Sequence, residues 1–251
     1  MKNKILLLAT ITVVLVSGMQ VFALNQSNYK YYTNKNGITL TQKEMDFVNQ
    51  FYGKNFFDKM TLEDYEWIED LNINTNDISI ETYYDSSLSS NDIDKRKSTS
   101  HATNYKKISI AKSCSNVCTI ITDVEWYINP SIRSYDIIGY RFVNTSLTSN
   151  VITTKVSSSI GTTYFSNNKI FQNGVGCSIK LPDNATNIMV QQKIYTTANG
   201  HVYASYQHAT SNITLDISKQ YTIGTSVGNV FSLYGSAVGK FDQMGGVDIE
   251  L

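Results

Sequence analysis

Residues able to perform acid–base or nucleophilic chemistry are scarce in this sequence of 251 residues. Its three histidines are His101, His201 and His208, and none stands in a motif of a serine or cysteine nucleophile. Because a catalytic triad is assembled by the fold from distant residues, a secreted hydrolase with no recognisable motif stays an alternative. The sequence favours a protein that is not an enzyme, and it names no catalytic residue.

Two sets of oxygen-bearing side chains have the spacing of functional sites. Asp123 and Glu125 fall on one face of an expected strand, where paired carboxylates could act on a substrate or hold a cation. The simpler interpretation is the solvent face of an outer strand. The ligand spacing of an EF-hand loop is matched by Asp70, Asn72, Asn74, Asn76 and Glu81.

The calcium interpretation fails at other positions of that loop. Thr75 stands where the loop needs glycine, Asp77 replaces the usual apolar residue, and the residues that follow do not form a helical pattern. An asparagine-rich helix exit explains the segment better. The sequence therefore predicts no metal site and no cofactor.

The cysteines are Cys114, Cys118 and Cys177. The first two lie between expected strands, at a hairpin tip, where a disulfide is geometrically possible and suits an oxidising exterior. A zinc site is the alternative, but one pair of cysteines without a second pair or a nearby histidine has poor zinc spacing. We expect a Cys114–Cys118 disulfide and a buried, free Cys177.

One predicted hairpin supplies the candidate binding residues. Residues 188–197 and 201–208 both alternate, and a three-residue turn at 198–200 would pair Ile194 with Ala204. That register gathers the apolar residues on one face. It places four ligand-binding candidates together on the other face: Tyr195, Tyr203, Gln191 and Gln207. Sugar rings stack on flat aromatic side chains and amides bond hydroxyls, although the two tyrosines could instead cover the sheet or meet the helical arm.

The first residues have the pattern of a secretory signal peptide. Lys2 and Lys4 precede an apolar run that is too short for a membrane-spanning helix, and Ala23 follows at an expected cleavage position. We therefore predict removal of residues 1–23, no permanent membrane anchor and an extracellular, released protein. The full chain has 21 basic and 21 acidic residues, a balance that argues against a nucleic-acid partner.

Composition divides the rest into three parts. Residues 24–73 form a polar lead and a small helical hairpin, because Thr41 and Thr61 each begin a capping box followed by apolar residues at helical spacing. Residues 74–104 are rich in Ser, Asn and Asp and read as a polar linker, with one alternating stretch at 78–83. Residues 24–104 carry 8 basic and 13 acidic residues, so an acidic arm could lie against a mildly positive body, but a solvated arm is the simpler interpretation.

From residue 105 to residue 251 the apolar pattern has a period of two. Short alternating segments separated by Gly, Asn and Ser turns are typical of antiparallel sheets, and no helical pattern interrupts them. The sequence thus predicts a mainly β chain. Its body is an antiparallel β-sandwich of jelly-roll or Greek-key type, preceded by the helical hairpin and the linker.

Several of these segments resemble an uncharacterised family of secreted proteins from low-GC Gram-positive bacteria. The likeness lies in residues 133–139, the Cys114 to Cys118 tip, residues 202–209 and the helical segment 41–70. The resemblance implies export and brings no activity, cofactor or catalytic residue with it.

The first hypothesis is thus a secreted, non-catalytic module that binds a glycan or another cell-surface ligand. The hydrolase is the second. A pore-forming or toxin-like protein is the third, suggested by the Ser/Thr-rich residues 153–163, which lack an apolar face for lipid. The sequence does not define the ligand or the oligomeric state.

Overall fold

The computed structural model describes residues 30–74, 77–84, 106–126, 135–182, 188–209, 221–224, 230–233, 235, 238, 241–243 and 246–251. The chain divides into residues 1–30 and one compact unit of residues 31–251, which is described here by itself. The expected signal peptide lies outside the described residues. Within the described ranges, no helix has the length and apolar character needed to cross a membrane.

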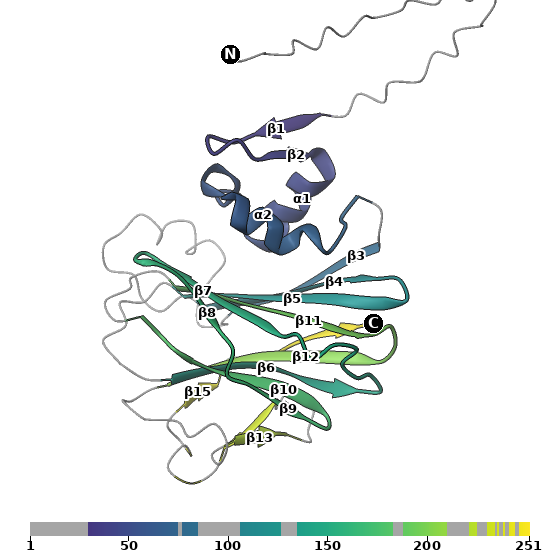
Figure 1. Ribbon diagram of the computed structural model, residues 1–251, viewed down its shortest axis with the longest axis vertical. Coiled ribbons are helices and arrows are strands. Elements are labelled where there is room, and N and C mark those ends of the chain that lie inside the picture. Colours follow the sequence, from purple (N-terminus) through teal and green to yellow (C-terminus); the bar gives the residue numbers. More distant parts are fainter. Residues whose placement is uncertain are drawn as a thin grey trace, which may run out of the picture. The chain divides into compact units, whose positions relative to one another are not determined.

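Two six-stranded antiparallel sheets form the body (Figure 1). The first sheet has the order β3 (Asp77–Tyr84), β4 (Lys106–Cys114), β5 (Val117–Trp126), β11 (Ile188–Thr197), β7 (Thr153–Ser158) and β8 (Gly161–Phe165). The second has the order β15 (Phe241–Gln243), β12 (His201–Ala209), β6 (Tyr135–Val143), β10 (Gly174–Lys180) and β9 (Asn168–Phe171), with β16 (Val247–Glu250) also beside β12. The predicted mainly β, antiparallel sandwich is confirmed.

Alternate residues of both sheets fill the space between them. β5 contributes Ile120 and Val124, and β6 contributes Ile138 and Tyr140, all fully buried. Because the side-chain period of a strand is two, the residues between these positions point to the outer faces of the sandwich. The two outer faces therefore carry the polar side chains whose roles decide what this fold can do.

The predicted pairing of residues 188–197 with 201–208 is wrong. β11 pairs with β5 and β7 in the first sheet, where Ile194 lies opposite Ile120. β12 pairs with β6 in the second sheet, where Ala204 lies opposite Tyr140. The alternation correctly identified the core residues, because a period of two fixes the buried face of a strand and leaves its partner strand open.

The turn between β11 and β12 carries the chain from one sheet to the other. Gly200 has a φ of 83°, and a Cβ there would lie 2.2 Å from the carbonyl oxygen of Val143. A side chain at this position would therefore meet both a strained backbone and a steric clash.

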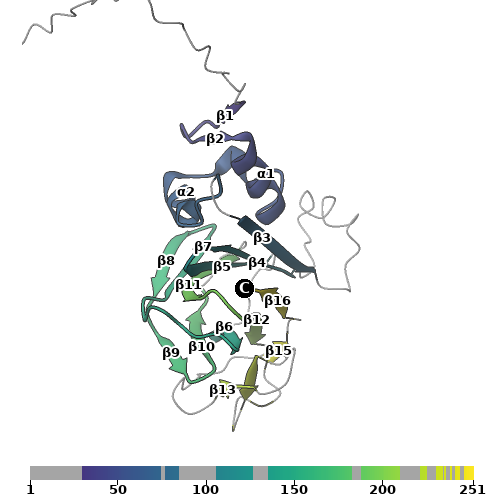
Figure 2. The same ribbon diagram turned by 90° about the vertical axis from the view of Figure 1, so that its right-hand side faces the viewer.

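A helical segment, residues 31–73, precedes the sheets and packs on the outer face of the first one (Figure 2). It contains β1 (Tyr31–Thr33), β2 (Thr39–Thr41), α1 (Gln42–Phe51), the 3-10 turn η1 (Phe57–Lys59) and α2 (Leu62–Glu69). Both predicted capping boxes are present, at Thr41 and Thr61. Thirteen of the fifteen buried members of its apolar cluster belong to the segment itself, and Ala111 and Ile121 come from the sheet.

Part of the predicted linker belongs to the sandwich. Residues 77–84 form β3, which pairs along its whole length with β4 at the edge of the first sheet. Ile78 and Ile80 pack against the apolar cluster of the helical segment. The sandwich therefore does not begin at residue 105 as predicted. An alternating stretch within the polar region, β3, already pairs with β4. Residues 85–105 lie outside the described ranges.

A short hairpin of β13 (Tyr221–Ile223) and β14 (Phe231–Leu233) lies on the outer face of the second sheet. Ile223, Val230 and Phe231 form an apolar cluster there with Ile137 of β6. Gly139 makes this contact possible, since a Cβ at that position would lie 2.8 Å from the ring of Phe231.

Candidate functional site

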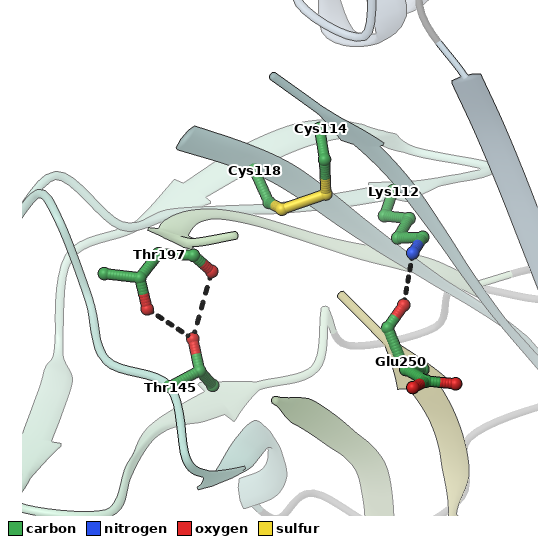
Figure 3. The surroundings of a disulfide bond; sticks show 6 residues. All are labelled: Lys112, Cys114, Cys118, Thr145, Thr197 and Glu250. Carbon is green, nitrogen blue, oxygen red and sulfur yellow. Dashed lines mark hydrogen bonds between the residues drawn. A yellow bond between two sulfur atoms is a disulfide. The ribbon is translucent and has the colours of Figure 1, made fainter. Parts of the chain in front are cut away.

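The disulfide prediction is confirmed at the tip of the β4–β5 hairpin. Cys114 and Cys118 are joined, and their Cα atoms lie 4.1 Å apart (Figure 3). Beside them, the Lys112 ammonium group donates to the carbonyl oxygen of Glu250, and Figure 3 shows this contact tying β16 to the tip. Cys177 is a free, buried thiol in the core, and burial raises its pKa to about 11.

Two of the four predicted ligand-binding residues lie against the helical segment. Gln191 is only 1% exposed, and its amide donates a 2.9 Å hydrogen bond to the Tyr52 hydroxyl. The Tyr195 hydroxyl donates a 2.9 Å hydrogen bond to Asp70. Both side chains therefore join the first sheet to the segment that covers it.

The other two residues lie on the opposite side of the sandwich. Tyr203 stands on the outer face of the second sheet, with the guanidinium carbon of Arg141 4.9 Å from its ring centroid and the ring of His201 stacked beside it. Gln207 is buried on the same face. The expected common surface of four residues is wrong, because β11 and β12 belong to different sheets whose outer faces point in opposite directions.

Asp123 and Glu125 do not form a solvent face. Asp123 is fully buried and Glu125 nearly so, in the layer between the first sheet and the helical segment. Burial raises the pKa of Asp123 well above its usual value, and the charge of Glu125 adds to this, while Lys107 and Lys155 oppose it. Neither oxygen of Asp123 has a hydrogen-bond partner of normal geometry. No local pattern around Asp123 and Glu125 indicated this cover, because the covering residues lie far away along the chain.

Two lysines of the sheet hold α2 on either side of Trp67. The Lys155 ammonium lies 5.1 Å from the ring centroid and 3.3 Å from Asp64. The Lys193 ammonium lies 4.9 Å from the same centroid and 3.0 Å from Asp70. Because Asp64, Trp67 and Asp70 are three residues apart, they follow one face of the helix. Acidic side chains of the arm therefore contact lysines of the body here, which is the alternative that the charge distribution left open beside a solvated arm.

A groove of about 380 Å³ lies between the helical segment and the first sheet. The segment lines it with Phe56, Lys59, Thr61, Glu63 and Asp64, and the sheet lines it with Glu125, Ser157, Ser158, Ser159, Thr162, Ile188 and Met189. Five hydroxyls and three carboxylates therefore surround a partly apolar surface. This is the arrangement among the described residues that best fits a small polar ligand.

An aromatic residue connects the two walls of the groove. Tyr164 of β8, beside the groove residue Thr162, donates a hydrogen bond to Glu63 of α2. Burial and the Glu63 carboxylate raise the pKa of Tyr164 to about 12, although the side chain is 53% exposed. Neither Tyr164 nor the groove was predicted from the sequence, because the two walls come from segments about a hundred residues apart. The Ser/Thr-rich run at 153–163 was the only local signal.

The histidines take structural positions. His208 lies 2.8 Å from Asp136 through Nδ1, and Asp136 also accepts hydrogen bonds from the Tyr206 hydroxyl and the Ala209 amide. These contacts join the beginning of β6 to the end of β12. His201 lies 3.4 Å from Asp248. His101 lies outside the described residues.

The five residues with EF-hand spacing do not close a loop. The Asp70 carboxylate is bonded to Lys193 and Tyr195, and Glu81 lies within β3, opposite Ile110. Asn76 lies outside the described residues. In the part of the chain that is described, no three His, Cys, Asp or Glu side chains gather closely enough to hold a metal ion.

No known protein family and no curated protein matches the chain. Among solved structures, it is similar to the collagen-binding subdomain of the Enterococcus faecalis surface protein ACE, at 15% identity and a TM-score of 0.27, covering 38% of this chain and 77% of that one. It is also similar to the collagen-binding domain of the Erysipelothrix rhusiopathiae surface protein RspB, at 10% identity and a TM-score of 0.32, covering 62% of this chain and 56% of that one. The fold assigned to this chain rests on its own strand pairing.

Proposed function

We propose that this protein is an exported, non-catalytic binding module that holds a glycan of a cell surface in the groove between the helical segment and the first sheet. The observation that carries the proposal is the lining of the groove. It combines five hydroxyls and three carboxylates with the apolar side chains of Phe56, Ile188 and Met189.

This lining matches the two faces of a sugar. Serine and threonine hydroxyls both donate and accept hydrogen bonds, and carboxylates accept them, so together they can satisfy a ring of hydroxyl groups. The flat, less polar face of a sugar packs on apolar or aromatic side chains, and the exposed ring of Tyr164 stands next to the groove. The volume lies at the lower end of the roughly 300–1,000 Å³ of small-ligand sites.

Export is supported by the signal-peptide pattern of residues 1–23 and by the Cys114–Cys118 disulfide, since disulfides persist in oxidising compartments. An exported module with a hydroxyl-rich groove would meet glycans of cell walls and host surfaces. The proposal therefore places the protein outside the cell and its ligand on a surface.

Tyr203 remains a second candidate contact. Its ring is partly exposed and stacks with His201, at a centroid distance of 6.2 Å. Gln191 and Gln207 are buried, and the Tyr195 hydroxyl is bonded to Asp70. A ligand at Tyr203 would not reach Tyr195, because the two residues lie on opposite outer faces of the sandwich. The two sites can thus be separated by single substitutions.

A screen of glycans and isolated cell walls against the purified protein tests the proposal. For a glycan found in this way, Tyr164→Ala should weaken binding by about 1–3 kcal/mol, the range for a central aromatic anchor. Thr162→Val should also weaken it, because the hydroxyl is lost while the shape of the side chain is kept. Tyr31→Ala is the control, since Tyr31 is equally exposed and does not line the groove.

Two results would reject this site. One is a screen that finds no glycan ligand. The other is a glycan ligand whose affinity is the same for the parent and both groove variants. A loss confined to Tyr203→Ala would move the site to the outer face of the second sheet.

A further inference from the structure

We infer that the helical segment is a movable wall of the groove, and that Lys155 and Lys193 hold it closed against the first sheet. The inference rests on the proposed function, because it concerns how a ligand enters the same groove. If this wall moves away from the sheet, a polymeric ligand can enter the groove from the side and needs no free end.

Polar contacts hold the segment on the sheet, in addition to the apolar contacts with Ala111, Ile121, Ile78, Ile80 and Met189. α2 is joined to the sheet by the Asp64–Lys155 and Asp70–Lys193 pairs, and α1 is joined through the Phe51 carbonyl, which accepts from Lys107. Asp70 is 49% exposed, so its pair is open to solvent and to salt. The pair made by the exposed Asp70 therefore contributes little to stability, whereas the Asp64–Lys155 pair, with only 1% of Lys155 and 17% of Asp64 exposed, gives the stronger hold.

The layer beneath the segment also contains polar atoms without a hydrogen-bond partner. They are the indole nitrogen of Trp67 and, within the segment itself, the side-chain oxygen of Asn49. A buried polar atom without a partner destabilises the state that buries it. Opening would expose these atoms to water. The hydrogen bonds that they gain with water would offset part of the free energy of the contacts that opening breaks.

Most buried members of the segment's apolar cluster belong to the segment itself. Its cluster includes Phe47, Phe51 and Ile68 among its own residues, and only Ala111 and Ile121 are buried members from the sheet. α1 and α2 both have complete capping boxes, so their N-terminal ends need no partner from the sheet. These features allow the segment to separate from the sheet as a unit.

Hydrogen–deuterium exchange of the full chain tests the inference without a ligand. The α2 amides should exchange faster than those of β5 and β11, because they open without unfolding of the sandwich. Lys193→Met should speed exchange in α2 roughly three- to tenfold, the effect of removing one cation–π contact and its ion pair. Sodium chloride at about 1 M should act in the same direction, since it screens the exposed Asp70–Lys193 pair.

Lys169→Met is the matched control, because the Lys169 ammonium lies 4.8 Å from the ring of Phe171 on the second sheet, at a comparable cation–π distance. It should leave exchange in α2 unchanged. Equal exchange rates in α2, β5 and β11 in every variant would overturn the inference, and if the glycan screen succeeded they would leave the proposed function intact. Selective opening of α2 in a protein that binds no glycan would support the movable segment and overturn the proposed function.

Discussion

The hydroxyl of Tyr140 donates a 2.8 Å hydrogen bond to the main-chain carbonyl of Gln192, across the middle of the sandwich. Tyr140 belongs to β6 of the second sheet and Gln192 to β11 of the first, so this contact joins the two sheets through their common core. Burial raises the pKa of Tyr140, which keeps its hydroxyl protonated and able to donate.

We predict that Tyr140→Phe lowers the free energy of unfolding by about 1 kcal/mol, the usual net contribution of one neutral hydrogen bond. Tyr206→Phe is the informative comparison. Tyr206 is equally buried, but its hydroxyl donates to the carboxylate of Asp136, so its loss should cost about 1.5–3 kcal/mol. Urea denaturation of both variants measures the difference. Equal losses would show that the hydrogen bond to the Asp136 carboxylate contributes no more than the one to the main-chain carbonyl.

The disulfide gives the second prediction. Cys114 and Cys118 close a very short loop, so the loss of both through Cys114→Ser and Cys118→Ser should lower the free energy of unfolding by only about 2 kcal/mol. Peptide mapping without reductant should find this link and a free Cys177. Cys177→Ala serves as the control for the loss of a thiol, and any bridge that contains Cys177 would contradict the structure.

Sequence patterns that depend on neighbouring residues were accurate for this fold. The capping boxes at Thr41 and Thr61 and the inward faces of β11 and β12 were predicted, because each depends on residues a few positions apart. The pairing of β11 and β12 was not, because both strands satisfy the same alternation whether they pair or face each other across the core.

The candidate site depends on contacts that no local pattern contains. Asp123 and Gln191 alternate with apolar residues as solvent-facing positions do, yet the helical segment covers them. The charge difference between the arm and the body was the only sequence signal of that cover. The groove itself combines α2 with the β7–β8 hairpin, and neither segment alone has the composition of a binding site.

Processing of the chain gives the third prediction. Residues 1–23 should be removed during export, so mass spectrometry of the protein from culture supernatant should find a chain that begins at Leu24. Ala23→Trp should block the cleavage, since a signal peptidase accepts only small side chains at this position. Exported protein that still begins with Met1 would contradict the prediction.

The fourth prediction concerns Asp123 and the pH dependence of stability. The folded protein raises the pKa of this carboxyl, chiefly by burial, whereas the unfolded chain leaves it near its ordinary value of about 3.9. Between these two values the folded protein holds a proton that the unfolded chain releases. The contribution of Asp123 to the free energy of unfolding should therefore fall as the pH rises from about 4 to the folded pKa.

Asp123→Asn keeps the shape of the side chain and cannot ionise, so its stability relative to the parent should increase as the pH rises across that window. Asp70→Asn is the control of opposite sign. Burial raises the pKa of Asp70, but hydrogen bonds from Lys193 and Tyr195 and the charge of Lys193 outweigh it and lower the pKa. Asp70 therefore stabilises the folded protein at pH values above its unfolded pKa, and this contribution is lost as the pH falls through its lower folded pKa. Asp70→Asn should lack this contribution at neutral pH.

Urea denaturation of the parent and both variants at several pH values from 4 to about 9 separates these effects. The difference between Asp123→Asn and the parent should grow in favour of the variant with pH, while Asp70→Asn should be weakest relative to the parent at neutral and higher pH. If Asp123→Asn were instead less stable than the parent at pH 8, Asp123 would be ionised in the folded state. Its charge would then be stabilised by Lys107 and Lys155, and the layer beneath the helical segment would be an ion network that favours closure.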